Sequence, residues 1–235
     1  MLAAATVLFW LGVAVAPAWG QEDSGEELYI AECAGCHGPA GGGTRWAPSI
    51  VDQGAAGADF MMRTGRMPLR TPDEAIRRGP RRLTPDQIEA ITSHMGRLGG
   101  PPVPSVDPQQ GDLGTGADLY LLNCAACHGA TGVGGALVGS RDAPSVLPSS
   151  ALEIAEAVRA GPGSMPAYPE AVLDQHELDS VTRYVLGLDE ADTPGGWSLG
   201  RWGPVAEGAA AWLIGLGGVI GAAAWIEGRT RELRP

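Results

Sequence analysis

The chain has 235 residues and a formal net charge of −11, and all sixteen of its basic residues are arginine. This length allows one large domain, or two small domains together with membrane segments. Nucleic-acid binding depends on a basic surface, so this acidic chain is not expected to bind nucleic acid. Residues 100–192 contain thirteen acids and three arginines, whereas residues 21–99 contain eleven acids and nine arginines. The acidic second half would be attracted to a basic partner, although ordinary solvation explains it equally well.

Residues 1–20 form an uncharged segment rich in Ala, Val and Leu. This composition is typical of a signal peptide, cut after the Ala16-Pro17-Ala18 stretch, or of a retained N-terminal membrane anchor. The basic start that both usually show is missing, and both alternatives stay open, with retention preferred. Acidic residues follow directly, among them Glu22 and Asp23, which suits the outer side of a membrane.

Two Cys-x-x-Cys-His motifs contain all four cysteines: Cys33-Ala34-Gly35-Cys36-His37 and Cys124-Ala125-Ala126-Cys127-His128. In this motif the two thiols form thioethers with one haem and the histidine ligates its iron. A zinc ribbon would place its cysteine pairs about 15–20 residues apart, whereas these lie 91 positions apart. A thioredoxin-like site would lie near a βαβ pattern and needs no histidine after its second cysteine. The motifs therefore predict two covalently bound haem c groups on the oxidising side of a membrane.

The surroundings of the two motifs are similar, which indicates an internal duplication. Leu28-Tyr29 matches Leu119-Tyr120 before the motifs, and Ala47-Pro48-Ser49 matches Ala143-Pro144-Ser145 after them. Each unit is expected to begin with a short helix that leads into the motif and to close with an amphipathic helix. The first closing helix should begin at Thr84-Pro85. At about 75 residues each, the units are small, and a bound haem would supply much of each core.

Axial iron ligands are expected from one histidine and one methionine in each unit, as is usual in cytochromes c. His37 and His128 are the predicted histidines. Met67 and Met165 are the predicted methionines, since both precede a proline and both follow an Arg-x-Gly element. The weaker candidates are Met61, Met62, Met95, His94 and His176. A histidine–methionine iron is saturated and transfers electrons, so no catalytic residue is predicted.

Two further features bear on the haem sites. Pro48 and Pro144 are expected to present their carbonyl oxygens to the ring nitrogen of each histidine that does not bind iron; the alternative is a plain turn proline. A cluster of arginines in the first unit would neutralise haem propionates or dock a partner, and a solvated loop explains it equally well. Its members are Arg63, Arg66, Arg70, Arg77, Arg78, Arg81 and Arg82.

Residues 208–226 are nineteen uncharged residues in a row, about 28 Å as a helix and enough to cross the hydrocarbon core of a bilayer. Arg229, Arg231 and Arg234 follow at once. Because positive residues accumulate on the cytoplasmic side, the C-terminus is expected in the cytoplasm of a plasma-membrane protein and the haem units outside.

These patterns predict a mainly α protein with two haem units and a hydrophobic segment at each end. The expected boundaries are 1–20 for the N-terminal segment, 24–98 and 114–188 for the two units, 99–113 and 189–203 for linkers, 204–228 for the transmembrane helix and 229–235 for the cytoplasmic tail.

The haem motif, the Ala-Pro-Ser loop, the Met-Pro loop and the closing helix together resemble a class I cytochrome c domain, present twice in tandem. The run from Leu199 to Gly208, with Trp212 and Trp225-Ile226, resembles the dihaem cytochrome c subunit of the actinobacterial menaquinol–cytochrome c reductase, the cytochrome bcc complex. The resemblance covers essentially the whole chain.

That resemblance implies an electron-transfer subunit of a translocase whose partners are a cytochrome b subunit and a Rieske iron–sulfur protein. The Rieske protein would reduce the first haem, and the second would pass the electron to the copper centre of a haem–copper terminal oxidase. Quinol oxidation would belong to the other subunits, and no quinone site is expected on this chain. Two alternatives remain: a stand-alone membrane-tethered dihaem carrier, and a dihaem peroxidase-like enzyme.

Overall fold

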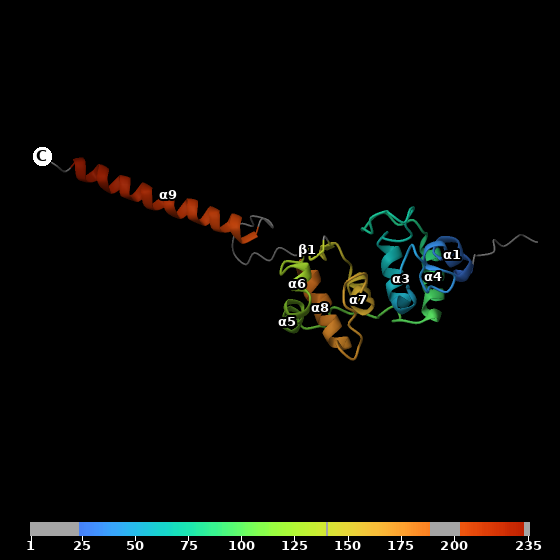
Figure 1. Ribbon diagram of the computed structural model, residues 1–235. Helices are drawn as coiled ribbons and strands as arrows, with labels where there is room; N and C mark the ends of the chain where they lie inside the picture. Colours follow the sequence, from blue (N-terminus) through green and yellow to red (C-terminus); the bar gives the residue numbers. More distant parts are fainter. Residues whose placement is uncertain (1–23, 140, 189–202, 233–235) are drawn as a thin grey trace, which may run out of the picture. The chain divides into compact units, whose positions relative to one another are not determined.

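The computed structural model describes residues 24–139, 141–188 and 203–232, and these are mainly helical, as predicted (Figure 1). The predicted N-terminal segment, residues 1–20, and nearly all of the second linker lie outside the described residues. The described part of the chain falls into two compact units. The first contains residues 24–106 and 152–175, and the second contains the described residues of 107–151 and those from 176 onward.

Besides most of α7 (Ala151–Ala160), the first compact unit contains the helices of the predicted first haem unit, residues 24–98. They are α1 (Gly25–Glu32), α2 (Ala34–His37), the short 3-10 helix η1 (Val51–Gln53), α3 (Gly54–Arg63) and α4 (Pro85–Leu98). Capping boxes begin α1 and α4: Ser24 pairs with Glu27, and Thr84 pairs with Gln87. Each box satisfies two backbone N–H groups that a helix start otherwise leaves without partners. The predicted start of the closing helix at Thr84-Pro85 is confirmed.

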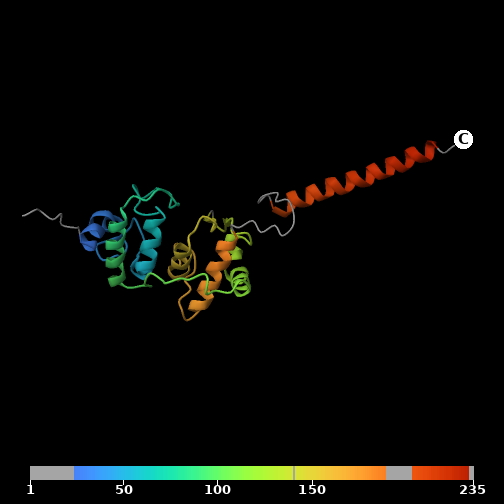
Figure 2. The same cartoon turned by 180° about the vertical axis from the view of Figure 1, so that it is seen from behind.

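The core of the first unit lies where α4 meets α1 and α3, and these helices lie side by side in both views (Figures 1 and 2). Ile88, Ile91 and Met95 form the buried face of α4, the amphipathic closing helix. They pack with Leu28, Tyr29, Met62 and Leu83. Burial of each large apolar side chain contributes about 1.5–3 kcal/mol.

The first and last helices of a haem unit cross at a glycine. A Cβ at Gly25 of α1 would overlap the carbonyl oxygen of Ala90 in α4. In the second unit, a Cβ at Gly116 of α5 (Leu113–Asn123) would overlap the carbonyl oxygen of Ser180 in α8 (Gln175–Gly187). Only glycine allows backbones to approach this closely. The duplication therefore extends to the crossing of the helices.

Three elements follow the second motif helix, α6 (Ala125–His128). They are β1 (Gly135–Leu137), β2 (Arg141–Ala143) and α7 (Ala151–Ala160). β1 and β2 pair antiparallel, with Ala136 opposite Asp142. Sequence analysis did not indicate this hairpin, because strands of three residues are too short to show an alternating pattern.

The C-terminal helix α9 (Gly203–Glu232) contains a segment, Gly208–Arg229, that is long and apolar enough to cross a membrane. Its large apolar side chains, such as Leu213 and Ile214, are exposed in the chain by itself. A helix that is apolar on all sides is typical of a membrane span. This agrees with the predicted transmembrane helix of residues 204–228.

Candidate haem sites

Each haem motif is a single turn of helix that continues directly from a longer helix. Cys33 ends α1, and its carbonyl oxygen accepts hydrogen bonds from the backbone N–H groups of Cys36 (3.2 Å) and His37 (2.9 Å). In the second unit the carbonyl oxygen of Cys124 accepts the same two bonds, from Cys127 at 3.1 Å and His128 at 2.9 Å. Residues three apart lie on one face of a helical turn. The backbone therefore presents both thiols of a motif together, in the same way twice.

All four cysteines are free thiols rather than disulfides. Burial raises the pKa of Cys33 to about 11, with a further contribution from Glu32, and burial also raises the pKa of Cys124 to about 11. A thioredoxin-like or zinc-binding cysteine would instead need a stabilised thiolate. Among the described residues no cluster of three or more His, Cys, Asp or Glu side chains is arranged to hold a metal ion. The raised pKa values of Cys33 and Cys124 do not suit the reactive thiolate of a thioredoxin-like site.

The two histidines of the motifs are oriented by backbone carbonyl groups. Nδ1 of His37 donates to the carbonyl oxygen of Pro48 at 2.9 Å, and Nδ1 of His128 donates to that of Pro144 at 2.8 Å. The predicted hydrogen bonds from the two histidine rings to the proline carbonyl oxygens are confirmed. With the proton on Nδ1, the Nε2 lone pair of each ring is available to iron, and the bond limits rotation of the ring.

A tight loop brings each proline carbonyl back to its histidine. The N–H of Gly43 donates to the carbonyl oxygen of His37 at 2.8 Å, and Gly134 bonds to His128 at the same distance. Both glycines have φ of +85°. A Cβ at Gly43 would come within 2.6 Å of the Ser49 nitrogen. The loop therefore requires glycine at this position in both units.

A buried tyrosine ties each N-terminal helix to the end of the motif, a contact that sequence analysis missed. The hydroxyl of Tyr29 donates to the carbonyl oxygen of Gly38, and that of Tyr120 donates to Gly129, both at 2.8 Å. Burial raises the pKa of Tyr120 to about 12, so it remains a neutral donor. The signal was present in the sequence, since each tyrosine precedes its glycine by nine residues.

The predicted methionine ligands lie in irregular segments that follow α3 and α7. Met67 and Met165 are both partly exposed. The backbone N–H of Met67 donates to the carbonyl oxygen of Met61, and that of Met165 donates to the carbonyl oxygen of Pro162. Their role as iron ligands stays a prediction.

The competing ligand candidates occupy other environments. Met62 and Met95 are buried in the core of the first unit, so packing explains them. The His94 ring lies against Tyr29, with ring centres 5.1 Å apart, and its Nδ1 accepts a hydrogen bond from Arg97 at 3.2 Å. His176 is exposed near the start of α8. Core packing and exposure thus account for these side chains.

Several members of the predicted arginine cluster are engaged within the protein. Arg78 binds Glu153 through both terminal nitrogens, at 3.1 and 2.9 Å. Arg82 forms an ion pair with Glu74 and donates to the carbonyl oxygen of Pro68 at 2.7 Å. These contacts make the segment between Met67 and α4 an ordered loop rather than a freely solvated one.

Comparison with known proteins identifies the family. The family model described as "Cytochrome C oxidase, cbb3-type, subunit III" matches twice, at residues 20–95 and 111–185. The cytochrome bc1 complex cytochrome c subunit of Mycobacterium leprae is 35% identical over 97% of this chain and 86% of its own length. The subunit of Mycobacterium bovis is 37% identical over 88% of this chain and 78% of its own length. The subunit of Corynebacterium diphtheriae is 34% identical over 88% of this chain and 80% of its own length. The chain belongs to the family of cytochrome bc1 complex cytochrome c subunits. Its two halves are tandem cytochrome c domains, and such domains bind haem c.

The residues present fit the haem of this family. Each motif offers two thiols for thioether formation and an imidazole whose Nδ1 is held by a proline carbonyl oxygen, which leaves Nε2 for iron. Next to Met67, the Arg66 guanidinium lies 4.8 Å from the centre of the Phe60 ring, and its buried Nη1 has no hydrogen-bond partner. Burial lowers the pKa of Arg66. A buried donor without a partner is costly, and a haem propionate would provide the missing acceptor.

Proposed function

We propose that the chain is the membrane-anchored dihaem cytochrome c subunit of a respiratory menaquinol–cytochrome c reductase. The observation that carries this proposal is the alignment with a cytochrome bc1 complex cytochrome c subunit, which is 35% identical and covers 97% of this chain. The matching hydrogen bonds of His37 and His128 to proline carbonyl oxygens in the two motifs also support it. A cytochrome b subunit and a Rieske iron–sulfur protein would be its partners, and a haem–copper oxidase would accept its electrons. Quinol oxidation would take place on the partner subunits.

The cofactors in this proposal are two haem c groups, which supply reversible one-electron transfer when bound. Cys33 and Cys36 would hold the first haem, and Cys124 and Cys127 the second. The domain limits that we propose for these units are residues 24–98 and 114–188.

The protein's own contribution is to orient and enclose each haem. His37 and His128 would ligate iron through Nε2, and the carbonyl oxygens of Pro48 and Pro144 would hold each ring in place and strengthen it as a ligand. Met67 and Met165 would complete the coordination, and a thioether ligand raises the reduction potential. A histidine and a methionine bound to each iron would suit electron transfer rather than substrate chemistry.

Membrane attachment would place both haem units on the extracytoplasmic side of the plasma membrane and residues 229–235 in the cytoplasm. The guanidinium of Arg229 lies 4.6 Å from the centre of the Trp225 ring. A cation beside an interfacial aromatic residue suits the cytoplasmic end of a span. Donor and acceptor partners would then meet the haem units in the same compartment, which removes the need for a diffusing carrier.

Copurification tests the assignment. The full chain, tagged at its C-terminus and extracted in mild detergent, should bring with it a cytochrome b subunit and a Rieske protein. A chain that purifies alone, with both haems reducible, would show a stand-alone carrier. Rapid oxidation of the reduced protein by hydrogen peroxide would show a peroxidase-like enzyme.

Haem counting tests the cofactor assignment separately. The wild-type chain should carry two covalent haems. Replacement of Cys124 and Cys127 by serine should leave one, and the same change at Cys33 and Cys36 should also leave one. An unchanged haem-to-protein ratio in either variant would contradict the assignment of that motif.

A further inference from the structure

A fully buried carboxyl group without a hydrogen-bond partner lies on α7. The Glu156 side chain is 0% exposed, and neither of its carboxyl oxygens has a hydrogen-bond partner in the described structure. Removing a charged carboxylate from water is strongly unfavourable unless a cation or several donors compensate it. This environment therefore suits the neutral, protonated form.

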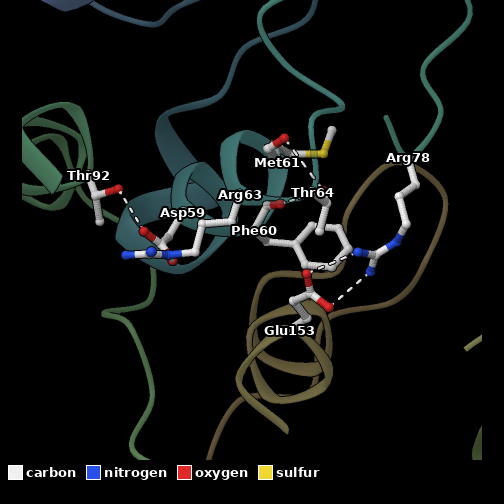
Figure 3. Close-up of polar contacts among 8 residues, drawn as sticks. All are labelled: Asp59, Phe60, Met61, Arg63, Thr64, Arg78, Thr92 and Glu153. Atoms are coloured by element: carbon white, nitrogen blue, oxygen red, sulfur yellow. Dashed lines mark hydrogen bonds and ion pairs between the residues drawn. The ribbon is translucent and has the colours of Figure 1, made fainter. Parts of the chain in front are cut away.

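The group that faces Glu156 is a second acid, Asp59 of α3, which is 2% exposed. Asp59 has partners of its own: Thr92 donates to it at 3.2 Å, and Arg63 forms an ion pair with it (Figure 3). Asp59 thus has a hydroxyl donor and a guanidinium as partners, whereas neither carboxyl oxygen of Glu156 has a hydrogen-bond partner. When two carboxyl groups meet in a site without water, the state in which they share one proton has a lower free energy than the state in which both are ionised.

The acids near Glu156 raise its pKa, and one cation opposes them. Its pKa is raised to about 9, first by burial and then by Asp59, with a smaller contribution from Glu153 on α7. Arg63 is the cation that opposes this rise, and its guanidinium is already bound to Asp59.

The other charged groups nearby are neutralised or more remote. Glu153 is held by both terminal nitrogens of Arg78, from the loop before α4 (Figure 3). From α4, Thr92 is uncharged, and Glu89 acts on Arg63. No further cation thus reaches the Glu156 carboxyl among the groups that determine its pKa.

The acid occupies a position that is apolar in the other repeat. Arg159-Ala160-Gly161 after α7 corresponds to Arg63-Thr64-Gly65 after α3, which places Glu156 opposite Phe60. The phenyl ring of Phe60 shows that this position in the helix accepts a fully apolar side chain. The helix itself therefore does not require a carboxyl group here.

α3 and α7 approach each other closely at this point. A Cβ at Gly57 would lie 3.4 Å from the Cβ of Ala160, and Nε2 of Gln53 donates to the carbonyl oxygen of Ala160 at 3.4 Å. α3 leads to Met67 and α7 leads to Met165, so this contact joins the two segments that end in the proposed iron ligands.

We propose that a proton shared between Asp59 and Glu156 holds α3 against α7 and thereby fixes the two haem segments for electron transfer from one to the other. This inference rests on the proposed function. Loss of the proton places two negative charges in a buried contact, and the two helices separate. The pair is a proton-binding site that couples electron transfer within the chain to pH.

Infrared spectroscopy of the haem-loaded full chain tests the proton. Wild type should show the carbonyl band of a buried carboxylic acid. The intensity of this band should fall to half near pH 9 and should then decrease about tenfold for each further pH unit. Glu156→Gln should lack this band. Glu170→Gln, at an exposed glutamate of the same compact unit, should retain it. A wild-type band that already disappears near pH 4.5, the ordinary value for glutamate, overturns the proposal.

Flash-induced electron transfer between the two haems tests the consequence. The rate should fall above about pH 9 in wild type and in Glu170→Gln, and stay constant over the same range in Glu156→Gln. An equal pH dependence in all three proteins overturns the proposal.

A second variant keeps the test decisive if Glu156→Gln does not assemble. Asp59→Asn removes the neighbouring charge and leaves Arg63 beside Glu156, so the band should titrate at lower pH than in wild type. An unchanged midpoint overturns the shared proton. Failure to copurify with a cytochrome b subunit contradicts the proposed function alone, because the infrared band needs no partner protein.

Discussion

The hydroxyl of Tyr29 donates a 2.8 Å hydrogen bond to the carbonyl oxygen of Gly38, the residue directly after the first motif histidine. The equivalent bond joins Tyr120 to Gly129. The Tyr29 side chain is 0% exposed and is held in the core. Its hydrogen bond therefore fixes the end of the haem motif to the first helix of the unit. The same contact in both units indicates a shared requirement for a fixed histidine.

Tyr29→Phe should destabilise the first haem unit by about 1–3 kcal/mol, because it leaves a carbonyl oxygen without its buried donor. Denaturant unfolding followed through haem absorbance measures this loss. Tyr184→Phe is the matched control, since it keeps the ring that packs on Tyr120 and its hydroxyl has no hydrogen bond among the described contacts. Equal stability of the two variants would contradict the proposed role of Tyr29.

Met165→Leu should lower the reduction potential of the second haem and change its absorption spectrum, because the variant loses the proposed thioether ligand. Redox titration followed at the haem bands measures both effects. Met95→Leu is the control: it replaces a core methionine with a side chain of similar volume and should cost less than about 1.5 kcal/mol. A Met165→Leu protein with wild-type potentials would refute the ligand assignment.

Gly116→Ala should destabilise the second haem unit by about 1–3 kcal/mol or more, because the new methyl group overlaps the carbonyl oxygen of Ser180 and overpacking forces the helices apart. Haem retention on heating measures the effect. Gly187→Ala has nothing within 4 Å of its new Cβ and should leave haem retention unchanged. The idea of a required close crossing would be wrong if both variants behaved like wild type.

The ion pair of Glu74 with Arg82 predicts a pH dependence at acid pH. The Arg82 guanidinium, together with the N–H of Arg70, lowers the pKa of Glu74 from 4.5 to about 2. A carboxyl whose pKa is lower in the folded state stabilises the fold above its unfolded pKa, and that stability is lost as pH falls through the folded pKa.

Between pH 4.5 and about 2, proteolysis of the loop before α4 should therefore accelerate in wild type. Glu74→Gln should already be cleaved faster than wild type at pH 4.5 and change less over this range. An acid protease active across the range allows the comparison. Identical profiles for the two proteins would show that the ion pair does not hold the loop.

Local sequence was sufficient wherever the signal lay within a few residues. The Cys-x-x-Cys-His motifs predicted haem c binding, which membership of a cytochrome c family supports, and the uncharged run at 208–226 predicted the apolar helix α9, which is long enough to cross a membrane. The match of Pro48 with Pro144 predicted two histidine hydrogen bonds that the structure confirms. These features depend on covalent neighbours and on helix geometry, which are the same in any fold.

Contacts across long stretches of chain were decided only by the tertiary structure. The sequence divides into two repeats, yet α7 belongs to the same compact unit as α3, and nothing in the spacing of either repeat indicates this. Glu156 resembles any surface glutamate of an amphipathic helix until Asp59 is placed beside it, 97 positions earlier in the chain. The sequence by itself determined which groups can bind haem and cross a membrane, because those signals are local. Only the tertiary structure decided which acidic side chains are buried away from solvent, because burial depends on the residues that pack against them.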